Sequence, residues 1–336
     1  MKFNDEQLRV AANLRQYYLA WLETKRGLSD CDYSLSWTTR DGIDYLRYRS
    51  AIKDTTLGPR SANTERQLAD HVARKAELVA QEQSRGDRLF ETGRLFVALR
   101  MGVIASPAAA ILREADIRAY LGTALMVVGT NALAAYELEA GARFAVGMDA
   151  TEDFDLAWSG NQKTVLALAG KHPVSLLALL KSIDNTYTVN AERTFQARNK
   201  HAYEVELLIA PSKTDSLPKS IGLSPIPLPE QEWLLQGTPV DQVVCGRDGS
   251  PAHIVAPDPR WFALHKLWMA EKPGRDVLKK PKDARQGKAL LDAISAWMPH
   301  YPLDTTFRDG LPDELRPHFD AWHTTQPARK DTRRPF

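Results

Sequence analysis

Val127-Val128-Gly129-Thr130-Asn131-Ala132-Leu133 is the most informative stretch of the chain, because the pattern of a buried strand changes there to the pattern of a helix. The apolar run Leu125–Val128 predicts a strand, and Asn131–Ala140 predicts a helix. At such a junction the free amide groups and the positive end of the helix dipole attract anions, and Gly129 lets a ligand approach the backbone closely. The stretch therefore predicts a binding site for phosphate groups at Gly129 and Thr130.

An acidic stretch, Thr151-Glu152-Asp153-Phe154-Asp155-Leu156, opens the next expected strand. Side chains alternate along a strand, so Asp153 and Asp155 share one face, while Phe154 and Leu156 point to the other. Two carboxylates held this close repel each other and take up a proton unless a divalent cation neutralises them. Magnesium is the expected ion, because it prefers oxygen ligands and is commonly held by one or two carboxylates together with substrate phosphates.

A further acidic pair lies in Tyr203-Glu204-Val205-Glu206-Leu207-Leu208, within the strand expected over residues 202–209. Glu204 and Glu206 share a face of this strand. We take Glu206, nearer the apolar end, as a third carboxylate, and Glu204 stays the competing candidate. Two ions roughly 4 Å apart on such carboxylates activate an attacking hydroxyl and neutralise a leaving pyrophosphate. The three stretches together favour nucleotidyl transfer.

The order of these motifs resembles the polymerase-β nucleotidyltransferase superfamily over about residues 107–210. That superfamily has a glycine-rich turn, a helix, an Asp-x-Asp pair and a later acidic residue. With Leu57-Gly58-Pro59-Arg60-Ser61 and Pro259-Arg260-Trp261-Phe262-Ala263-Leu264-His265-Lys266 added, nearly the whole chain is similar to a family of stand-alone bacterial nucleotidyltransferase-fold proteins. The third acid of the superfamily is usually aspartate, whereas this chain has Glu206.

The resemblance implies an NTP donor bound through two Mg²⁺ ions, with Mn²⁺ as a substitute. Asp153, Asp155 and Glu206 are then the metal ligands and catalytic carboxylates, and Gly129, Thr130 and Lys266 meet the nucleotide. The implied reaction moves a nucleoside monophosphate to a hydroxyl group and releases pyrophosphate.

The acceptor is open among an RNA or tRNA 3′ end, a protein side chain and a small molecule. The RNA acceptor is favoured by three arginines, Arg47, Arg49 and Arg60, and by the basic segment 272–288. A catalytically silent nucleotide- or RNA-binding protein on the same fold is the alternative function.

Each feature alone has an ordinary explanation. An isolated Asp-x-Asp is commonly a solvated strand edge, and Gly129-Thr130 alone is an ordinary junction of a strand and a helix. Lys266, beside apolar helix residues, can send its ammonium group to water, and segment 272–288 can be a solvated helix face. The chain contains no P-loop, dinucleotide-binding or nucleophile-elbow motif. The functional interpretation therefore depends on the combination of the motifs.

The composition is that of an ordinary globular protein. The 336 residues include 44 basic and 42 acidic side chains, and the net charge of +2 is too small for a dedicated duplex-binding protein. Cys31 and Cys245 are too few for a disulfide framework. No segment is typical of a signal peptide or a membrane span. We expect a cytoplasmic protein without membrane contact.

We predict an α+β fold, with a polymerase-β-like nucleotidyltransferase sheet between a helical N-terminal region and a helical C-terminal part. The N-terminal region, residues 1–105, contains a small β-hairpin, and the catalytic domain covers residues 106–215. A mainly helical part, residues 216–323, closes the nucleotide site, and residues 324–336 form a basic tail.

The expected elements follow from hydrophobic periodicity. Helices are predicted over residues 4–24, 61–99, 107–120, 173–181, 259–270 and 282–298, and strands over residues 33–37, 43–48 and 190–195 in addition to those above. Residues 212–232 are predicted to be a loop. In the long helix 61–99, the periodicity predicts that the following side chains are buried: Leu68, Val72, Ala76, Val79, Leu89 and Leu95.

Overall fold

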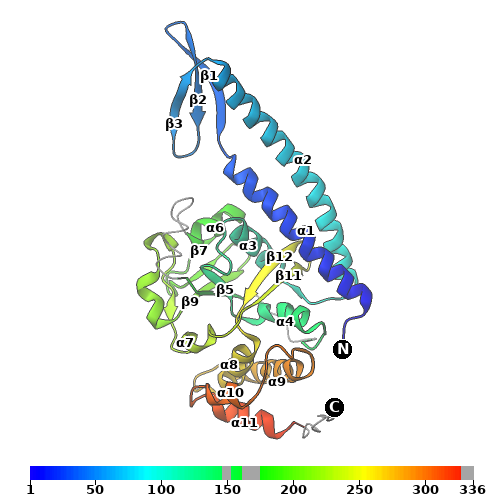
Figure 1. The fold of residues 1–336 in the computed structure, drawn as a ribbon. Coiled ribbons are helices and arrows are strands. Elements are labelled where there is room, and N and C mark those ends of the chain that lie inside the picture. Colours follow the sequence, from blue (N-terminus) through cyan, green and yellow to red (C-terminus); the bar gives the residue numbers. More distant parts are fainter. Residues whose placement is uncertain (146–152, 161–174, 327–336) are drawn as a thin grey trace.

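The computed structural model describes residues 1–145, 153–160 and 175–326. The fold is α+β, as the sequence predicts. A long two-helix arm carries a small sheet at its tip and joins a body that contains two further sheets (Figure 1). The C-terminal helices lie at the end of the body that is farthest from the tip of the arm (Figure 1).

The arm consists of α1 (Asp5–Asp30) and α2 (Ala62–Ala98), which lie side by side. Both helices begin with a capping box, formed by Asn4 at α1 and Ser61 at α2. Three antiparallel strands connect the helices at the tip, namely β1 (Ser34–Arg40), β2 (Ile43–Arg49) and β3 (Asp54–Pro59). The predicted hairpin is confirmed, and β3 extends it to a three-stranded sheet.

The arm packs on the body along α1, as far as Arg26, and at the C-terminal end of α2. The buried side chains there include Leu14 and Tyr18 of α1, Phe96 of α2 and Val243 of the body. The predicted burial of apolar side chains along α2 is correct for Leu89. It is wrong for most of the others, because the following side chains are exposed: Val72, Ala76, Val79 and Leu95. The prediction is wrong for these residues because the upper part of α2 is covered on one side only (Figure 1).

The central sheet contains the predicted acidic strands. Its strand order is β5-β6-β9-β8-β7, with β10 paired to β9. The strands are β5 (Leu125–Val127), β6 (Asp153–Trp158), β7 (Thr188–Val189), β8 (Gln196–Arg198), β9 (Glu204–Ile209) and β10 (Ile226–Pro227). Strand β6 is parallel to β9 and antiparallel to β5. The nearby helices are α3 (Ser106–Ile117), α4 (Leu133–Ala140) and α6 (Leu176–Ile183).

One predicted strand of this region is wrong. Residues 190–195 form a turn between β7 and β8, because the side-chain oxygen of Asn190 accepts the backbone N–H groups of Glu192 and Arg193. The helix predicted over residues 173–181 is present as α6, and residues 173–174 lie outside the described residues.

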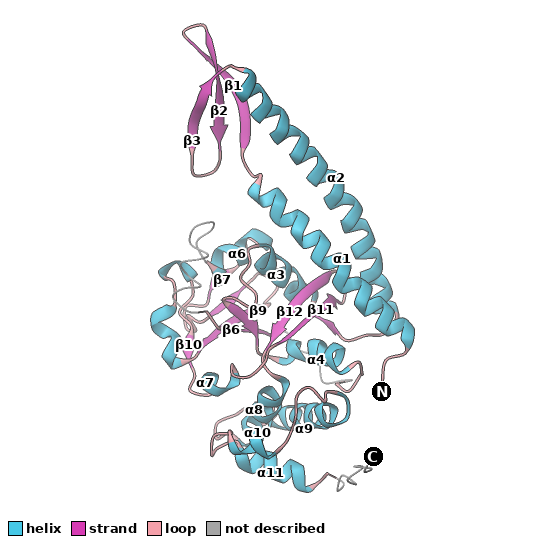
Figure 2. Cartoon of the chain, in the orientation of Figure 1, coloured by secondary structure: helices cyan, strands magenta, loops and turns pink. Residues whose placement is uncertain are grey.

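The second sheet of the body has the order β12-β11-β4. It pairs the hairpin of β11 (Val240–Gly246) and β12 (Pro251–Ala256) with β4 (Val103–Ile104), which lies far away in the sequence. The predicted helices of the C-terminal part are α8 (Pro259–Glu271) and α9 (Lys280–Trp297). Three shorter helices complete this part of the molecule (Figure 2), namely α7 (Gln231–Leu234), α10 (Thr305–Asp309) and α11 (Arg316–Thr324).

Within the part of the chain that the structure describes, every helix is too short or too polar to span a bilayer.

A charge network that is buried except at Asp241 fastens the arm to the body. The Tyr18 hydroxyl of α1 donates to Asp116 Oδ2 over 3.0 Å, and Nδ1 of His253 on β12 lies 3.0 Å from the same oxygen. Nε2 of His253 lies 3.0 Å from Asp241 on β11. Burial by itself lowers the pKa of His253, but the hydrogen bonds and charges of Asp116 and Asp241 outweigh it and raise this pKa to about 9.

We expect His253 to make the stability of the fold depend on pH. Its raised pKa means that the stabilisation is fully present below the unfolded value of about 6.5 and is lost as the pH rises through about 9. The loss should amount to about 2 kcal/mol, since one pKa unit corresponds to about 1.4 kcal/mol and the exposure of Asp241 weakens its contribution. Urea denaturation of the wild type and of His253→Gln at pH 6 and pH 9.5 measures it. A stability difference between the two proteins that is equal at both pH values would contradict the prediction.

Candidate active site

Four carboxylates lie next to each other on β6 and β9. The parallel register places Asp153 opposite Glu204 and Asp155 opposite Glu206. The intervening side chains Phe154, Leu156, Val205 and Leu207 are fully buried on the other face, as the predicted alternation requires. Both glutamates face the cavity described below, so the choice between them as third carboxylate is not decided by the register.

The junction between β5 and α4 lies directly against the acidic strands. Gly129 precedes a 3₁₀ turn, Thr130–Ala132, which leads into α4. A Cβ atom added at Gly129 would lie 2.0 Å from Asp155 Oδ2. The backbone N–H of Val128 donates to the carbonyl oxygen of Asp155 over 3.1 Å. A larger residue at this position would have to displace Asp155 or the junction, and the predicted phosphate site and the predicted metal site are therefore adjacent.

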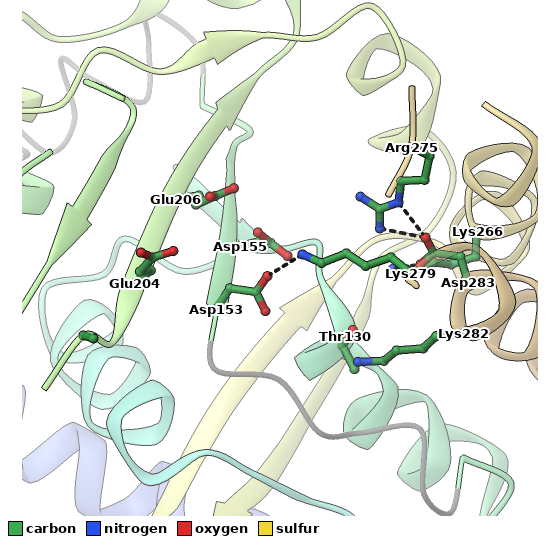
Figure 3. A pocket seen from close by; sticks show the side chains of 11 residues that line it. Thr130, Asp153, Asp155, Glu204, Glu206, Lys266, Arg275, Lys279, Lys282 and Asp283 are labelled. Atoms are coloured by element: carbon green, nitrogen blue, oxygen red, sulfur yellow. Dashed lines mark hydrogen bonds and ion pairs between the residues drawn. The ribbon is translucent and has the colours of Figure 1, made fainter. Parts of the chain in front are cut away.

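Basic side chains from α8, α9 and their connection form the opposite wall (Figure 3). Nζ of Lys266, which is buried, donates to Asp283 Oδ1 over 3.0 Å. The guanidinium of Arg275 binds the other oxygen of Asp283 over 2.7 and 2.9 Å. Nζ of Lys279 lies 3.3 Å from Asp153 Oδ2, so it reaches from the basic wall to the acidic one.

A cavity of about 540 Å³ lies between the two walls. Its lining is almost entirely charged or polar, and it consists of Thr130, Asp153, Asp155, Ala202, Glu204, Glu206, Lys266, Arg275, Lys279, Lys282 and Asp283. Five of the six residues predicted for the site line this cavity. The sixth, Gly129, lies against Asp155 at the edge of the cavity. Lys266 lies in the wall of the cavity and is ion-paired, so it does not extend into bulk water.

Two of the carboxylates on β6 and β9, Asp155 and Glu206, lie where their negative charge is disfavoured. Burial, together with the charges of Asp153 and Glu206, raises the pKa of Asp155 to about 7. Burial also raises the pKa of Glu206, although a hydrogen bond from Gln196 opposes this effect. Such a group of acids favours either a bound proton or a bound cation.

The donor set fits a magnesium ion that substrate phosphates help to hold. Among the described residues, no three His, Cys, Asp or Glu side chains converge on one point as metal ligands. Asp153 and Asp155 nevertheless form a pair on one strand face, with Glu206 in register beside Asp155. One or two carboxylates completed by phosphate oxygens and water are the usual environment of Mg²⁺ in proteins.

Several residues of the site were not identified individually from the sequence. Arg275, Lys279 and Lys282 belong to the basic segment 272–288, and the sequence pattern gives no separate role to any one of these cations. Asp283 and Asp276 both interrupt that basic run, but only Asp283 is buried and ion-paired, so the sequence alone does not distinguish them. Gln196 and its neighbour Arg198 come from a strand that was predicted at the wrong residues, so no local pattern pointed to them.

Comparison with known proteins gives one family. No curated protein and no solved structure matches the chain. A family model described as Nucleotidyltransferase matches residues 106–311, which is well over half of the chain and includes every residue that lines the cavity. The resemblance to nucleotidyltransferases is thus confirmed over these residues, and the protein is a transferase of phosphorus-containing groups. The chain belongs to this nucleotidyltransferase family.

Proposed function

We propose that the protein transfers a nucleoside monophosphate from a magnesium-bound NTP to a hydroxyl group and releases pyrophosphate. The observation that supports this reaction best is the cavity with four carboxylates on one wall and four cationic side chains near the other. A triphosphate with its metal ions matches this distribution of charge, because phosphoryl chemistry depends mainly on positioning and charge stabilisation.

The residues of the cavity divide into three roles under this proposal. Asp153, Asp155 and one glutamate, Glu206 or Glu204, hold two Mg²⁺ ions, which Mn²⁺ can replace. When bound, these ions supply charge neutralisation at the reacting phosphate. Lys266, kept in place by Asp283, meets the triphosphate from the basic wall together with the neighbouring cations. Gly129 and Thr130 offer backbone N–H groups to the phosphates at the start of the helix.

RNA is the acceptor that we favour. Arg47 and Arg49 alternate along β2 with Leu46 and Tyr48, so both arginines lie on the outer face of the tip sheet. Arg47 is ion-paired with Asp54, whereas Arg49 is exposed. Arg60 contributes less to this surface, because it stacks over Trp37 with 5.1 Å between its Cζ and the ring centroid, and it is ion-paired with Glu65.

We place the reaction in the cytoplasm. Cys31 and Cys245 are both free and buried, which agrees with a reducing compartment.

Labelled nucleotides test the proposal. The purified protein is incubated with each NTP labelled at the α-phosphate, Mg²⁺ and total cellular RNA, and in parallel with bulk protein or a metabolite extract. We expect label in RNA, and we expect its transfer to weaken steeply with added salt, because contacts to the phosphate backbone depend on released counterions.

The other outcomes are equally informative. Label in protein or in small molecules would replace the RNA acceptor and keep the reaction. Magnesium-dependent NTP binding without any transfer would support the catalytically silent alternative. A protein that binds no NTP would exclude both functions.

A further inference from the structure

One buried amide connects the two glutamates that compete for the role of third carboxylate. Gln196 on β8 is fully buried and lies opposite Glu206 in the antiparallel register. Its Nε2 donates to Glu204 Oε2 over 2.8 Å and to Glu206 Oε1 over 3.0 Å. Both N–H bonds of the amide are therefore used by carboxylates of the cavity wall.

A second amide fixes the orientation of the first. Nδ2 of Asn190 donates to Gln196 Oε1 over 2.7 Å. The oxygen of the Asn190 amide is occupied by the backbone N–H groups of Glu192 and Arg193, at 3.0 and 3.3 Å. The backbone turn thus determines which way Asn190 points, and Asn190 determines which way Gln196 points. A reversed Gln196 amide would place its oxygen against two carboxylates.

The two glutamates differ in the contacts that their oxygens make. Glu204 uses both oxygens, because Oε1 accepts from Arg198 Nε over 2.7 Å and Oε2 accepts from Gln196. Glu206 accepts from Gln196 through Oε1, and its Oε2 makes no hydrogen bond to another described residue. A cation neutralises Glu204, whereas a neutral amide holds Glu206 and leaves its charge in place beside Asp155.

We propose that Gln196 is a positioning residue that presents Glu206 as the third metal-binding carboxylate and, with Arg198, keeps Glu204 out of the ligand set. This inference rests on the proposed function, which identifies the bound cation as Mg²⁺. It assigns a role to Asn190 as well, because the Gln196 amide has its donor side toward the carboxylates only while Asn190 holds its oxygen.

Binding of Mn²⁺ measures this role without turnover. Electron paramagnetic resonance gives the Mn²⁺ affinity in the presence of a non-hydrolysable NTP analogue. We expect Glu206→Gln and Gln196→Met to weaken Mn²⁺ binding about tenfold or more, since residues that orient metal ligands typically contribute 10- to 100-fold in affinity. Glu204→Gln should weaken it by at most about threefold, because its charge is already neutralised by Arg198.

A matched control comes from another strand. Gln242 on β11 also donates to one carboxylate, Glu139 Oε2, over 2.6 Å, but it lies outside the cavity. Gln242→Met should leave Mn²⁺ binding unchanged. Asn190→Asp is the second test, since it keeps the acceptor oxygen of the turn but replaces the donor that faces Gln196, and we expect it to weaken Mn²⁺ binding as Gln196→Met does.

The values of kcat and KM distinguish a positioning role of Gln196 from a merely structural one. We expect Gln196→Met to lower kcat about tenfold or more, with KM for the NTP changed by less than about threefold, because the triphosphate meets the opposite wall. Wild-type Mn²⁺ affinity in a folded Gln196→Met protein would overturn the inference, as would equal losses in Glu204→Gln and Glu206→Gln. Should Gln196→Met not fold, wild-type affinity in Asn190→Asp would overturn it.

The two proposals fail in different ways. Mn²⁺ binding without turnover on any acceptor would overturn the proposed function and keep the inference. Turnover with unchanged Mn²⁺ affinity in the Gln196 and Asn190 variants would do the reverse. A wild-type protein that binds no Mn²⁺ would overturn both.

Discussion

Replacing Asp155 with asparagine is expected to lower the rate of nucleotidyl transfer by about 1,000-fold. The carboxylate lies at the centre of the acidic group, against Gly129 and in register with Glu206. A metal ion on such a ligand supplies several kcal/mol of charge stabilisation, and about 4 kcal/mol corresponds to three powers of ten in rate. Release of pyrophosphate in the presence of the accepted substrate measures the change.

The same substitution should stabilise the metal-free protein. The pKa of Asp155 is raised to about 7, so the folded state opposes its charge at every pH above the unfolded value of about 4. This cost grows between pH 4 and pH 7 and is complete above pH 7, where removing the charge should add roughly 2–4 kcal/mol to the free energy of unfolding. The gain should vanish below pH 4, because the carboxyl group is then protonated in both states.

Asp313→Asn serves as the control. Asp313 is almost fully exposed, and its ion pair with Arg316, the only one it forms with a described residue, lies at the surface, so neither activity nor stability should change measurably. If Asp155→Asn were inactive and also less stable than the wild type at pH 8 without metal, the loss of activity would reflect misfolding, and the assigned role would not be supported.

Gly129→Ala should have the second largest effect. The backbone of Gly129 has φ near −93°, which alanine adopts without strain, so the effect is purely steric. The new methyl group would meet Asp155 Oδ2 at 2.0 Å, and either the carboxylate or the junction must move. We expect kcat to fall about 100-fold, since a displacement near 1 Å in an active site has this effect, and stability to fall by about 1–3 kcal/mol.

Gly310→Ala provides the matched comparison. Gly310 also has negative φ, near −79°, and an added Cβ would have only ordinary contacts at 3.6 Å. Thermal unfolding and the rate of transfer should therefore stay close to the wild-type values. Near wild-type activity in Gly129→Ala would show that Asp155 can move without loss, which would contradict the tight geometry of the site.

The local patterns of the acidic strands were sufficient to predict one wall of the cavity. Alternation placed Asp153 with Asp155 and Glu204 with Glu206 on single strand faces, and the change of pattern at Gly129 identified the junction beside them. These predictions succeed because the period of a strand depends on the backbone alone. The pairing of Asp155 with Glu206 depends on a parallel register between distant segments, which no local pattern contains.

The other differences between the predicted and the observed fold also have physical causes. The hairpin of β11 and β12 pairs with β4, more than a hundred residues earlier, so its strands are buried by partners that the local sequence does not reveal. The stripe of Val72 and Val79 has the periodicity of a buried helix face, but periodicity cannot show whether a partner is present. Asn190 interrupts a predicted strand because its side chain competes with strand pairing for backbone N–H groups.

The arm sets a lower size limit for any molecule that touches the tip sheet and the cavity together. Helix α2 has 37 residues and is therefore about 55 Å long. The tip lies at the opposite end of the molecule from α8 and α9, which form the basic wall (Figure 1). A free nucleotide or a sugar is far shorter than this helix, so the tip cannot contribute to its affinity. Only a macromolecule can be held at both places at once.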